Sequence, residues 1–547
     1  MEYNRAQRLL DETIDYLQAL NKQNLPPPKQ INEDILGRIR VVFDLRNASM
    51  FNYKEVKWKI PDSLSPSQIA VILNNLHIVR RVSCTDGEDE GYDLIAVYQE
   101  DGPDKGLYRP DEEYFNRLAR QYQRDLTESQ LKEVRSQIRS EVPRAHLCNE
   151  RHLIAVNNGI FNFDTKQLLP FTPDKVFLTK CRVDYVASPK SPVIHNSNDN
   201  TDWEVEEWIK ELSDDDGVPE LIWEIMGAAI RPNVRWNKAA FLYSEEGNNG
   251  KGTLCALMRN LCGKGNCASI NLHELGEKFA LEPLIHSSAI IVDENPVGTY
   301  IDDASNAKSI ITNDTIRIDR KYRMPISFQF RGFMVQCLNG LPKVKDKSDS
   351  FYRRQLLVPF RKCFTGMERK YIKDDYINRK EVLEYVLWRI LNMDYYSLSE
   401  PAVCKEALGK FKVFNNPILQ FWSELRGQFV WDLLPYQFLY DMYKGWCRKT
   451  CPSGQIVSKN TFMHELKPIV ANAPDWTVSD SPVTTGNKLD IGEPLIGEYN
   501  VVDWMDQGYS GNNPILKYRP GTSNLKSSYR GLQRVRVSAQ QAVMVKP

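Results

Sequence analysis

A tight polar turn in the middle of the chain has the residue types that bind phosphate. It follows an apolar, β-rich run and leads into a helix-compatible segment, and it comprises Gly247, Asn248, Asn249, Gly250, Lys251, Gly252 and Thr253. Glycines allow backbone N–H groups to converge on anionic oxygens, and the positive end of the following helix dipole strengthens that attraction. Lys251 can reach β- and γ-phosphates. We expect a phosphate-binding loop; the alternative is a surface turn that contains Gly-Lys.

The turn departs at two positions from the usual pattern G-x-x-x-x-G-K-[ST]. Glu245 stands at the position of the leading glycine, and Gly252 stands where a serine or threonine normally follows the lysine. Gly252 has no hydroxyl with which to ligate Mg²⁺. Either Thr253, one residue further on, or a water molecule is expected to take that role.

Paired carboxylates follow the turn. Asp293 and Glu294 end the short apolar run of residues 287–292. Ligands of a parallel sheet bind at the carboxyl ends of its strands, so both acids are expected to face the phosphates. Asp293 is the candidate Mg²⁺ ligand, and Glu294 is the candidate group that polarises the attacking water. An ordinary strand that ends in an acidic turn is the alternative.

Two further polar features complete this set. The apolar run 332–338 ends in Asn339, whose amide is suited to sensing a γ-phosphate or positioning water, although Asn-Gly is more often only a turn. Arg353 and Arg354 precede another apolar run. An arginine supplied by a neighbouring subunit strongly stabilises the transition state of phosphoryl transfer, so this pair is the candidate arginine finger. A surface arginine pair is the alternative.

Length and composition indicate a globular protein of several domains. The 547 residues are too many for one core and predict about three or four domains. No apolar run approaches the length of a membrane span and the first residues are polar, so we expect a cytoplasmic protein without membrane contact. The eleven cysteines form no C-x-x-C pair and the seven histidines are dispersed, which argues against a disulfide framework or a local zinc site.

The region before the turn reads as a mixed α+β domain. Helical periodicity covers residues 1–24, 61–80, 111–121 and 127–142, and strand-like runs cover 92–98 and 175–179. Asn158-Gly159 predicts a tight hairpin turn. Residues 188–202 are rich in Pro, Ser, Asn and Asp and predict a linker, after which helices are expected over 203–212 and 219–230.

The region after residue 380 is predicted to contain helices over 381–393, 435–448 and 458–467, the last with Ser458 as its N-cap. Residues 517–547 carry seven lysines and arginines and no acid, as suits a DNA backbone or an acidic partner, or a flexible solubilising end. Residues 316–330 alternate apolar side chains around a basic tip and predict a β-hairpin.

Two resemblances to known proteins rest on these motifs. The order of sequence from Leu153-Ile-Ala-Val-Asn-Asn-Gly-Ile-Phe to Val183-Asp-Tyr resembles the domain that precedes the motor in phage, plasmid and poxvirus-type primase-helicases. The order of phosphate loop, Asp-Glu, Asn and Arg-Arg resembles superfamily 3 helicases of the AAA+ class. Together they cover roughly residues 152–475.

The resemblance implies roles that the residues alone do not. In this family the hairpin projects into a central channel and grips DNA; its tip here is Arg320, Lys321, Tyr322 and Arg323. The helix at 458–467 resembles the recognition helix of the winged-helix module that follows the motor, which would expose Lys459, Asn460 and His464 and bury Phe462 and Leu466. The family also implies a ring, expected to be a hexamer, that binds ATP with Mg²⁺ between subunits and moves 3′→5′.

The resulting hypothesis is an α/β protein with three parts: an N-terminal α+β domain (1–195), an AAA+ motor (196–395) and a winged-helix-like domain with a basic tail (396–547). The resemblance implies the ATP-dependent replicative helicase of a mobile element in a bacterial host cell, and a self-loading origin initiator is a further hypothesis. No primase motif is evident, so a separate primase or polymerase is the expected partner. The alternatives are a nucleotide phosphotransferase and a DNA-binding protein that uses ATP only as a switch.

Overall fold

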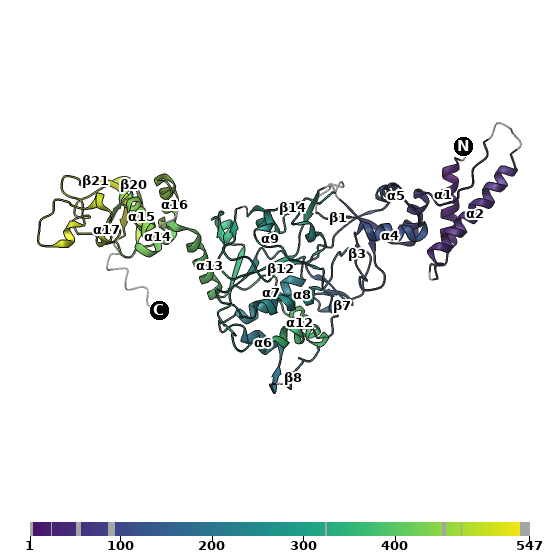
Figure 1. The fold of residues 1–547 in the computed structure, drawn as a ribbon, viewed down its shortest axis with the longest axis horizontal. Helices are drawn as coiled ribbons and strands as arrows, with labels where there is room; N and C mark the ends of the chain where they lie inside the picture. The colour runs from purple at the N-terminus through teal and green to yellow at the C-terminus, as the bar shows by residue number, and fades with distance from the viewer. Residues whose placement is uncertain are drawn as a thin grey trace. The chain divides into compact units, whose positions relative to one another are not determined.

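The computed structural model describes residues 4–22, 24–50, 56–85, 93–197, 199–302, 304–322, 325–450, 456–471 and 473–535. The chain separates into two compact units, residues 1–408 and residues 409–547, and each is considered by itself (Figure 1). Both units mix helices and strands, so the mixed α/β class is confirmed. The three functional domains and their predicted boundaries stay a prediction.

The N-terminal part of the first unit sets helices against a small sheet. The helices are α1 (Arg5–Ala19), α2 (Pro28–Ala48), α3 (Pro66–Leu76), α4 (Glu112–Tyr122) and α5 (Glu128–Glu141). The sheet has the order β3-β2-β1-β4, with β1 (Val79–Ser83), β2 (Leu94–Tyr98), β3 (Tyr108–Arg109) and β4 (Arg144–His146). Ser65 and Thr127 begin α3 and α5 with capping boxes, which satisfy N–H groups that a helix start leaves free.

The segment between this part and the phosphate loop differs from the prediction at residues 158–159, at residues 175–179 and in the predicted linker of residues 188–202. Strands β5 (Leu153–Val156) and β6 (Gly159–Asn162) pair Val156 with Gly159, so the turn is Asn157-Asn158 and Gly159 belongs to the strand. Residues 175–179 contribute one bridge, Val176 with Leu147, instead of a strand.

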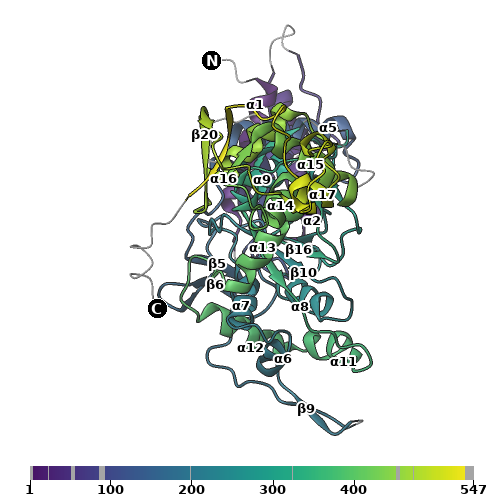
Figure 2. The same cartoon turned by 90° about the vertical axis from the view of Figure 1, so that its left-hand side faces the viewer.

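The predicted linker of residues 188–202 contains the strand β8 (Ile194–Asn196), which pairs with β9 (Thr201–Trp203). This hairpin projects from the unit in both views (Figures 1 and 2). The composition of this segment is typical of a flexible linker. Backbone pairing and burial of Ile194 and Trp203 nevertheless hold it in a regular structure.

A five-stranded parallel sheet forms the centre of the first unit. Its order is β11-β12-β16-β10-β18, and its strands are β11 (Cys267–Ala268), β12 (Ala289–Val292), β16 (Phe333–Leu338), β10 (Ala239–Tyr243) and β18 (Gln355–Pro359). These strands are short apolar runs because both faces of a parallel sheet are covered. The covering helices include α7 (Val218–Ile230), α8 (Lys251–Cys262) and α12 (Lys380–Leu391), and α7 and α8 lie side by side (Figure 2).

The second unit combines helices with a three-stranded antiparallel sheet of order β19-β21-β20. Its elements include α14 (Pro417–Leu425), β19 (Leu433–Pro435), α15 (Tyr436–Thr450), α16 (Lys459–Ala471), β20 (Trp476–Thr484), α17 (Pro494–Glu498) and β21 (Ser528–Arg534). Aromatic side chains dominate its core, with Trp422, Trp431, Trp446 and Trp476 almost fully buried. Such large buried apolar areas stabilise a small unit.

None of the helices in the described ranges has the length and apolar character needed to cross a bilayer.

The central sheet gives a stability prediction. Leu242 on β10 is fully buried, whereas Leu45 on α2 is 66% exposed. Leu242→Ala should lower the free energy of unfolding by about 2–5 kcal/mol, because it removes buried methyl groups and leaves a cavity. Leu45→Ala should change it little. Urea unfolding of both variants checks this, and an equal effect of the two would contradict the assigned core.

Candidate functional site

The phosphate-loop residues lie between β10 and α8, at the carboxyl edge of the sheet. Gly250 ends the loop with φ +83°, in the left-handed region that favours glycine, and α8 begins at Lys251. A Cβ on Gly250 would lie 2.4 Å from Leu212 Cδ2, so the backbone approaches α6 (Val205–Glu211) and its end too closely for a side chain. Gly247 lies outside the left-handed region and has open space, so its glycine is not required for the turn; Asn248, with φ +50°, adopts that conformation instead.

The two loop asparagines hold the loop in shape. The Asn249 side-chain amide donates to the Glu246 carbonyl oxygen at 2.6 Å, and its Oδ1 accepts the Lys251 N–H at 3.4 Å. The Asn248 amide donates to Thr365 Oγ1 at 3.2 Å and to Glu368 Oε1 at 3.0 Å. These side chains therefore position the loop backbone.

Lys251 is the most unusual group in the loop. The residue is only 4% exposed, and its ammonium nitrogen is buried with no hydrogen-bond partner in the described part of the chain. Burial lowers the pKa of Lys251, because a desolvated ammonium is disfavoured. A buried ammonium with three unused donors is costly unless an anion accepts them. The site is therefore built for an anion that the protein does not supply.

Asp293 follows β12, which β16 separates from β10, and an arginine that the sequence did not indicate holds it in place. Arg259 on α8 donates from Nη2 to the Ile291 carbonyl oxygen at 2.9 Å and to Asp293 Oδ1 at 3.0 Å. This hydrogen bond lowers the pKa of Asp293, so the carboxylate is ionised and fixed in orientation. Glu294 follows it and is exposed. Arg259 lies about two turns after Gly252, on the same face of α8, and this spacing could have pointed to it.

Asn339 and a hidden amide network occupy the neighbouring strand end. Asn339 is half-buried and follows β16 beside the start of the loop, where the Ser244 N–H donates to the Leu338 carbonyl oxygen at 3.0 Å. Asn295 is buried and donates to Gln336 Oε1 at 2.9 Å and to the Cys337 carbonyl oxygen at 3.0 Å. Asn295 ties the turn after Asp293 and Glu294 to β16, a role that the sequence analysis did not predict.

A pocket of about 350 Å³ opens beside the loop. Asn248, Gly250 and Thr253 line one side, and residues of α6, of the segment 364–369 and of α11 (Lys370–Asp374) line the other. Thr253 shares a face of α8 with Asn260, whose amide donates to the Ile377 carbonyl oxygen and to Asn378 Oδ1. Gly252 lies on a different face, the one that carries Arg259. A volume of this size is typical of small-molecule sites.

Lys373 of α11 reaches the open side of Gly252. Its Nζ lies 3.7 Å from the place that a Cβ on Gly252 would occupy. Its charge also contributes to the lowered pKa of Asp293, after the larger effects of Arg259. The missing side chain at Gly252 therefore leaves room for a second cation near the loop, which the sequence did not indicate.

Arg353 and Arg354 lie at the opposite edge of the same sheet. They precede β18, whose Gln355 pairs with Ala239 at the start of β10, and the loop follows Tyr243 at the other end of β10. Five residues of strand separate the two edges by about 16 Å. Arg353 is exposed, whereas Arg354 is half-buried and donates to the Ser350 carbonyl oxygen. The structure thus does not bring either arginine to the loop of its own chain.

The predicted basic hairpin is present. Strands β14 (Thr315–Ile318) and β15 (Ile326–Gln329) pair antiparallel, as the alternation indicated. Lys321 is exposed and Tyr322 is 94% exposed with φ +60°, while Arg320 is half-buried. Arg323 lies outside the described residues.

Helix α16 of the second unit has the predicted orientation. Ser458 Oγ accepts the Thr461 N–H at 3.2 Å as an N-cap, and Phe462 and Leu466 are buried, which confirms that part of the prediction. Asn460 and His464 are exposed, and Lys459 Nζ donates to Gln437 Oε1. Whether these three residues contact DNA stays a prediction.

Three family models match separate segments, and none spans half of the chain. "D5 N terminal like" matches residues 51–214, "Family of unknown function (DUF5906)" matches 242–354, and "Poxvirus D5 protein-like" matches 414–499. No curated protein matches the chain. The flanks therefore resemble the poxvirus D5 group, in agreement with the poxvirus-type resemblance seen in the sequence.

Solved structures give only weak likenesses. An apo structure of the NrS-1 C-terminal region is 12% identical and has a TM-score of 0.39, and the match covers 87% of this chain and all of that one. A ligand-bound JCV helicase is 18% identical with a TM-score of 0.26, over 38% of this chain and 58% of that one. Scores this low do not bear on function.

The buried ammonium gives the first site prediction. Lys251→Met should stabilise the nucleotide-free protein by about 1–3 kcal/mol, because it removes an unsatisfied buried donor. The same variant should lose the thermal stabilisation that Mg-nucleotide gives to the wild type. Melting curves with and without a non-hydrolysable ATP analogue measure both effects, with the exposed Lys264→Met as control. Retained stabilisation by the analogue would contradict the assignment.

The second site prediction concerns pH. The Arg259 guanidinium holds the pKa of Asp293 below its usual range, so the carboxylate stays ionised as pH falls and protonates only below its ordinary pKa. In Arg259→Met that pKa should rise, and Mg²⁺-dependent nucleotide binding should be lost at a higher pH than in the wild type. Arg259→Lys, which keeps the charge, should shift less. Binding curves of a fluorescent ATP analogue across the acidic range decide this, and coincident acid limbs would count against it.

Proposed function

We propose that the chain is an ATP-dependent DNA helicase of the superfamily 3 type that replicates a mobile element, such as a phage, plasmid or genomic island, in a bacterial cytoplasm. The observation that carries the proposal is the buried, unpartnered Lys251 ammonium at the start of α8. The same sheet carries an exposed basic hairpin, inserted between β12 and β16. The matches to poxvirus D5 models on both flanks support a replicative, helicase-like role.

ATP binds with its phosphates at the loop and its nucleoside in the adjoining pocket. Lys251, the N–H groups around Gly250 and the start of α8 hold the β- and γ-phosphates, and Thr253 and Lys373 add polar contacts. Trp208, Phe364 and Met367, which line the pocket, offer apolar surface to a base. Glu294 orients and polarises the attacking water, and Asn339 reports the presence of the γ-phosphate.

The residues fit a magnesium site whose coordination the substrate phosphates complete. Asp293 is an ionised, exposed carboxylate at the sheet edge, and carboxylate oxygen is a ligand that Mg²⁺ prefers. The described ranges contain no cluster of three metal-binding side chains, and Mg²⁺ in nucleotide sites usually relies on one or two carboxylates with phosphate oxygens and water. When bound, the ion neutralises developing phosphate charge.

The position of the arginines supports a ring assembly. Arg353 and Arg354 lie at the sheet edge opposite to the loop, so an arginine that completes the site comes from a neighbouring subunit. Of the two, Arg353 is the exposed one, and we assign it as the finger. Repetition of this head-to-tail contact closes into a ring, proposed to be a hexamer.

DNA contacts the hairpin tip in the central channel. Arg320 and Lys321 bind backbone phosphates and Tyr322 stacks on a base or sugar, with 3′→5′ movement of the single strand. The second unit, with α16 exposing Asn460 and His464, is proposed as a winged-helix-like module that binds duplex, and a separate primase or polymerase starts synthesis. A nucleotide phosphotransferase has no use for a hairpin whose aromatic tip is 94% exposed.

Strand displacement on a forked DNA tests the function. The wild type should separate the strands with ATP and Mg²⁺, and Lys251→Ala should abolish this. Lys321→Ala and Tyr322→Ala should reduce unwinding at least tenfold while retaining DNA-independent ATP hydrolysis; Lys347→Ala, an exposed lysine away from the tip, is the control. Hydrolysis without displacement, unaffected by DNA or by Lys321, would support the switch or phosphotransferase alternatives instead.

Mixing two inactive variants tests the arginine in trans. Lys251→Ala subunits keep Arg353, and Arg353→Ala subunits keep the loop. A mixed ring contains interfaces where an intact loop meets an intact arginine, so ATP hydrolysis should partly return on mixing. No recovery, together with evidence that the variants assemble with each other, would place the arginine elsewhere.

A further inference from the structure

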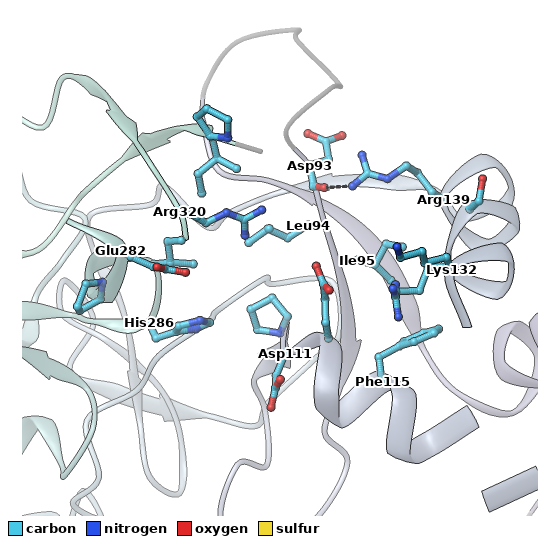
Figure 3. A pocket seen from close by; sticks show the side chains of 18 of the residues that line it. Asp93, Leu94, Ile95, Asp111, Phe115, Lys132, Arg139, Glu282, His286 and Arg320 are labelled. Atoms are coloured by element: carbon cyan, nitrogen blue, oxygen red, sulfur yellow. Dashed lines mark hydrogen bonds between the residues drawn. The ribbon is translucent and has the colours of Figure 1, made fainter. Parts of the chain in front are cut away.

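A large hollow lies between the N-terminal helices and the tip end of the hairpin, inside the first unit (Figure 3). Its volume is about 770 Å³. Residues of β2, α4 and α5 form one wall, and residues 279–286 together with Arg320 and Ile326 form the other. In Figure 3 Lys132, Phe115 and Arg139 lie on the first wall, and Glu282, His286 and Arg320 on the second. We call this hollow the α5 groove.

One face of α5 lines the groove with cations. Lys132, Arg135 and Arg139 recur at three- and four-residue spacing and therefore share a helix face. Arg139 donates to the Asp93 carbonyl oxygen at 2.7 Å, and Arg135 donates to Asn116 Oδ1, so both guanidinium groups are held in place with further donors to offer. Lys132 is exposed and forms no ion pair or hydrogen bond with any described residue.

Part of the acidic charge in the groove is already neutralised. Asp93 is buried and is bound by Arg81 at 3.2 Å and by Arg144 at 2.8 Å. Asp111 accepts the Glu113 N–H at 2.9 Å as the N-cap of α4 and pairs with Arg109 at 3.3 Å. The remaining acids on the lining are Glu112 and Glu282, whereas α5 alone contributes three cations, Lys132, Arg135 and Arg139. The groove therefore attracts anions.

An aromatic ring faces the same hollow. Phe279 lines the groove, is 48% exposed and has φ +67°, a conformation that a bulky residue rarely adopts. Strained residues of this kind persist where the surrounding structure holds them for a purpose. Cations that can bind phosphates, together with an exposed aromatic plane, are the features of surfaces that bind single strands.

The groove continues from the hairpin. Arg320 belongs to both, since it lines the groove and precedes the exposed Lys321 and Tyr322. The hairpin strand β15 is bonded to the N-terminal part, where the Gln329 N–H donates to the Cys84 carbonyl oxygen at 3.0 Å. A strand that passes the hairpin tip therefore has a continuous basic surface along α5.

We propose that the α5 groove binds a segment of single-stranded DNA, with phosphates on Lys132, Arg135, Arg139 and Arg320 and a base stacked on Phe279. The single strand is favoured over duplex because the bases of a duplex are stacked inside, out of reach of an aromatic side chain. This assignment rests on the proposed helicase function and extends its DNA contacts to the N-terminal part of the chain.

Binding of fluorescent oligo(dT) to the full chain tests the proposal. Lys132→Glu should weaken binding roughly tenfold and lower the salt dependence by about 0.7 in slope, as expected for one lost phosphate contact on a single strand. Phe279→Gly, which removes the ring and relieves the backbone, should weaken binding about fivefold or more. Lys22→Glu, an exposed lysine on the same N-terminal part outside the groove, is the control and should bind normally.

The outcomes separate this inference from the helicase proposal. Wild-type binding by Lys132→Glu and Phe279→Gly, with weaker binding by Lys321→Ala, would overturn the groove and leave the hairpin assignment intact. Normal binding by all three variants would overturn both. Equal competition by a duplex of the same length would overturn the choice of a single strand. DNA-independent ATP hydrolysis should stay unchanged in both groove variants, which shows that they are folded.

Discussion

The ammonium of Lys251 is buried where the protein offers it no acceptor. The first turn of α8 points further N–H groups in the same direction, because the first four amides of a helix have no partner within it. In the proposed function these donors bind phosphate, which offsets the cost of burying the ammonium. Gly250 and the two asparagines maintain this arrangement, since they fix the backbone between β10 and α8.

The parallel sheet brings further polar residues to the same edge as the loop. Because β12, β16 and β10 run in the same direction, Asp293, Asn339 and the loop emerge at one edge. The same rule places Arg353 at the other edge, away from the loop of its own chain. Strand direction thus separates the loop from Arg353, and the basic hairpin lies between β12 and β16 in the sequence.

Local sequence patterns predicted the elements whose signals are short-range. The strands around the loop, the hairpin at 315–329 and the inward side of α16 follow from apolar periodicity and turn chemistry. The residues that the sequence did not reveal act across long separations. Arg259 meets Asp293, Asn295 meets Gln336 and Lys373 approaches Gly252 only because the fold brings separate segments together. The β8–β9 hairpin was missed because its composition resembles a linker, and pairing overrides that preference.

The proposed function requires the phosphate site and the basic hairpin to act together. The most direct measurement is the rate of ATP hydrolysis by the full chain as single-stranded DNA is added. We expect DNA to stimulate hydrolysis in the wild type, and Lys321→Ala to lose this stimulation while keeping the basal rate. A hydrolysis rate that does not respond to DNA in either protein would contradict it.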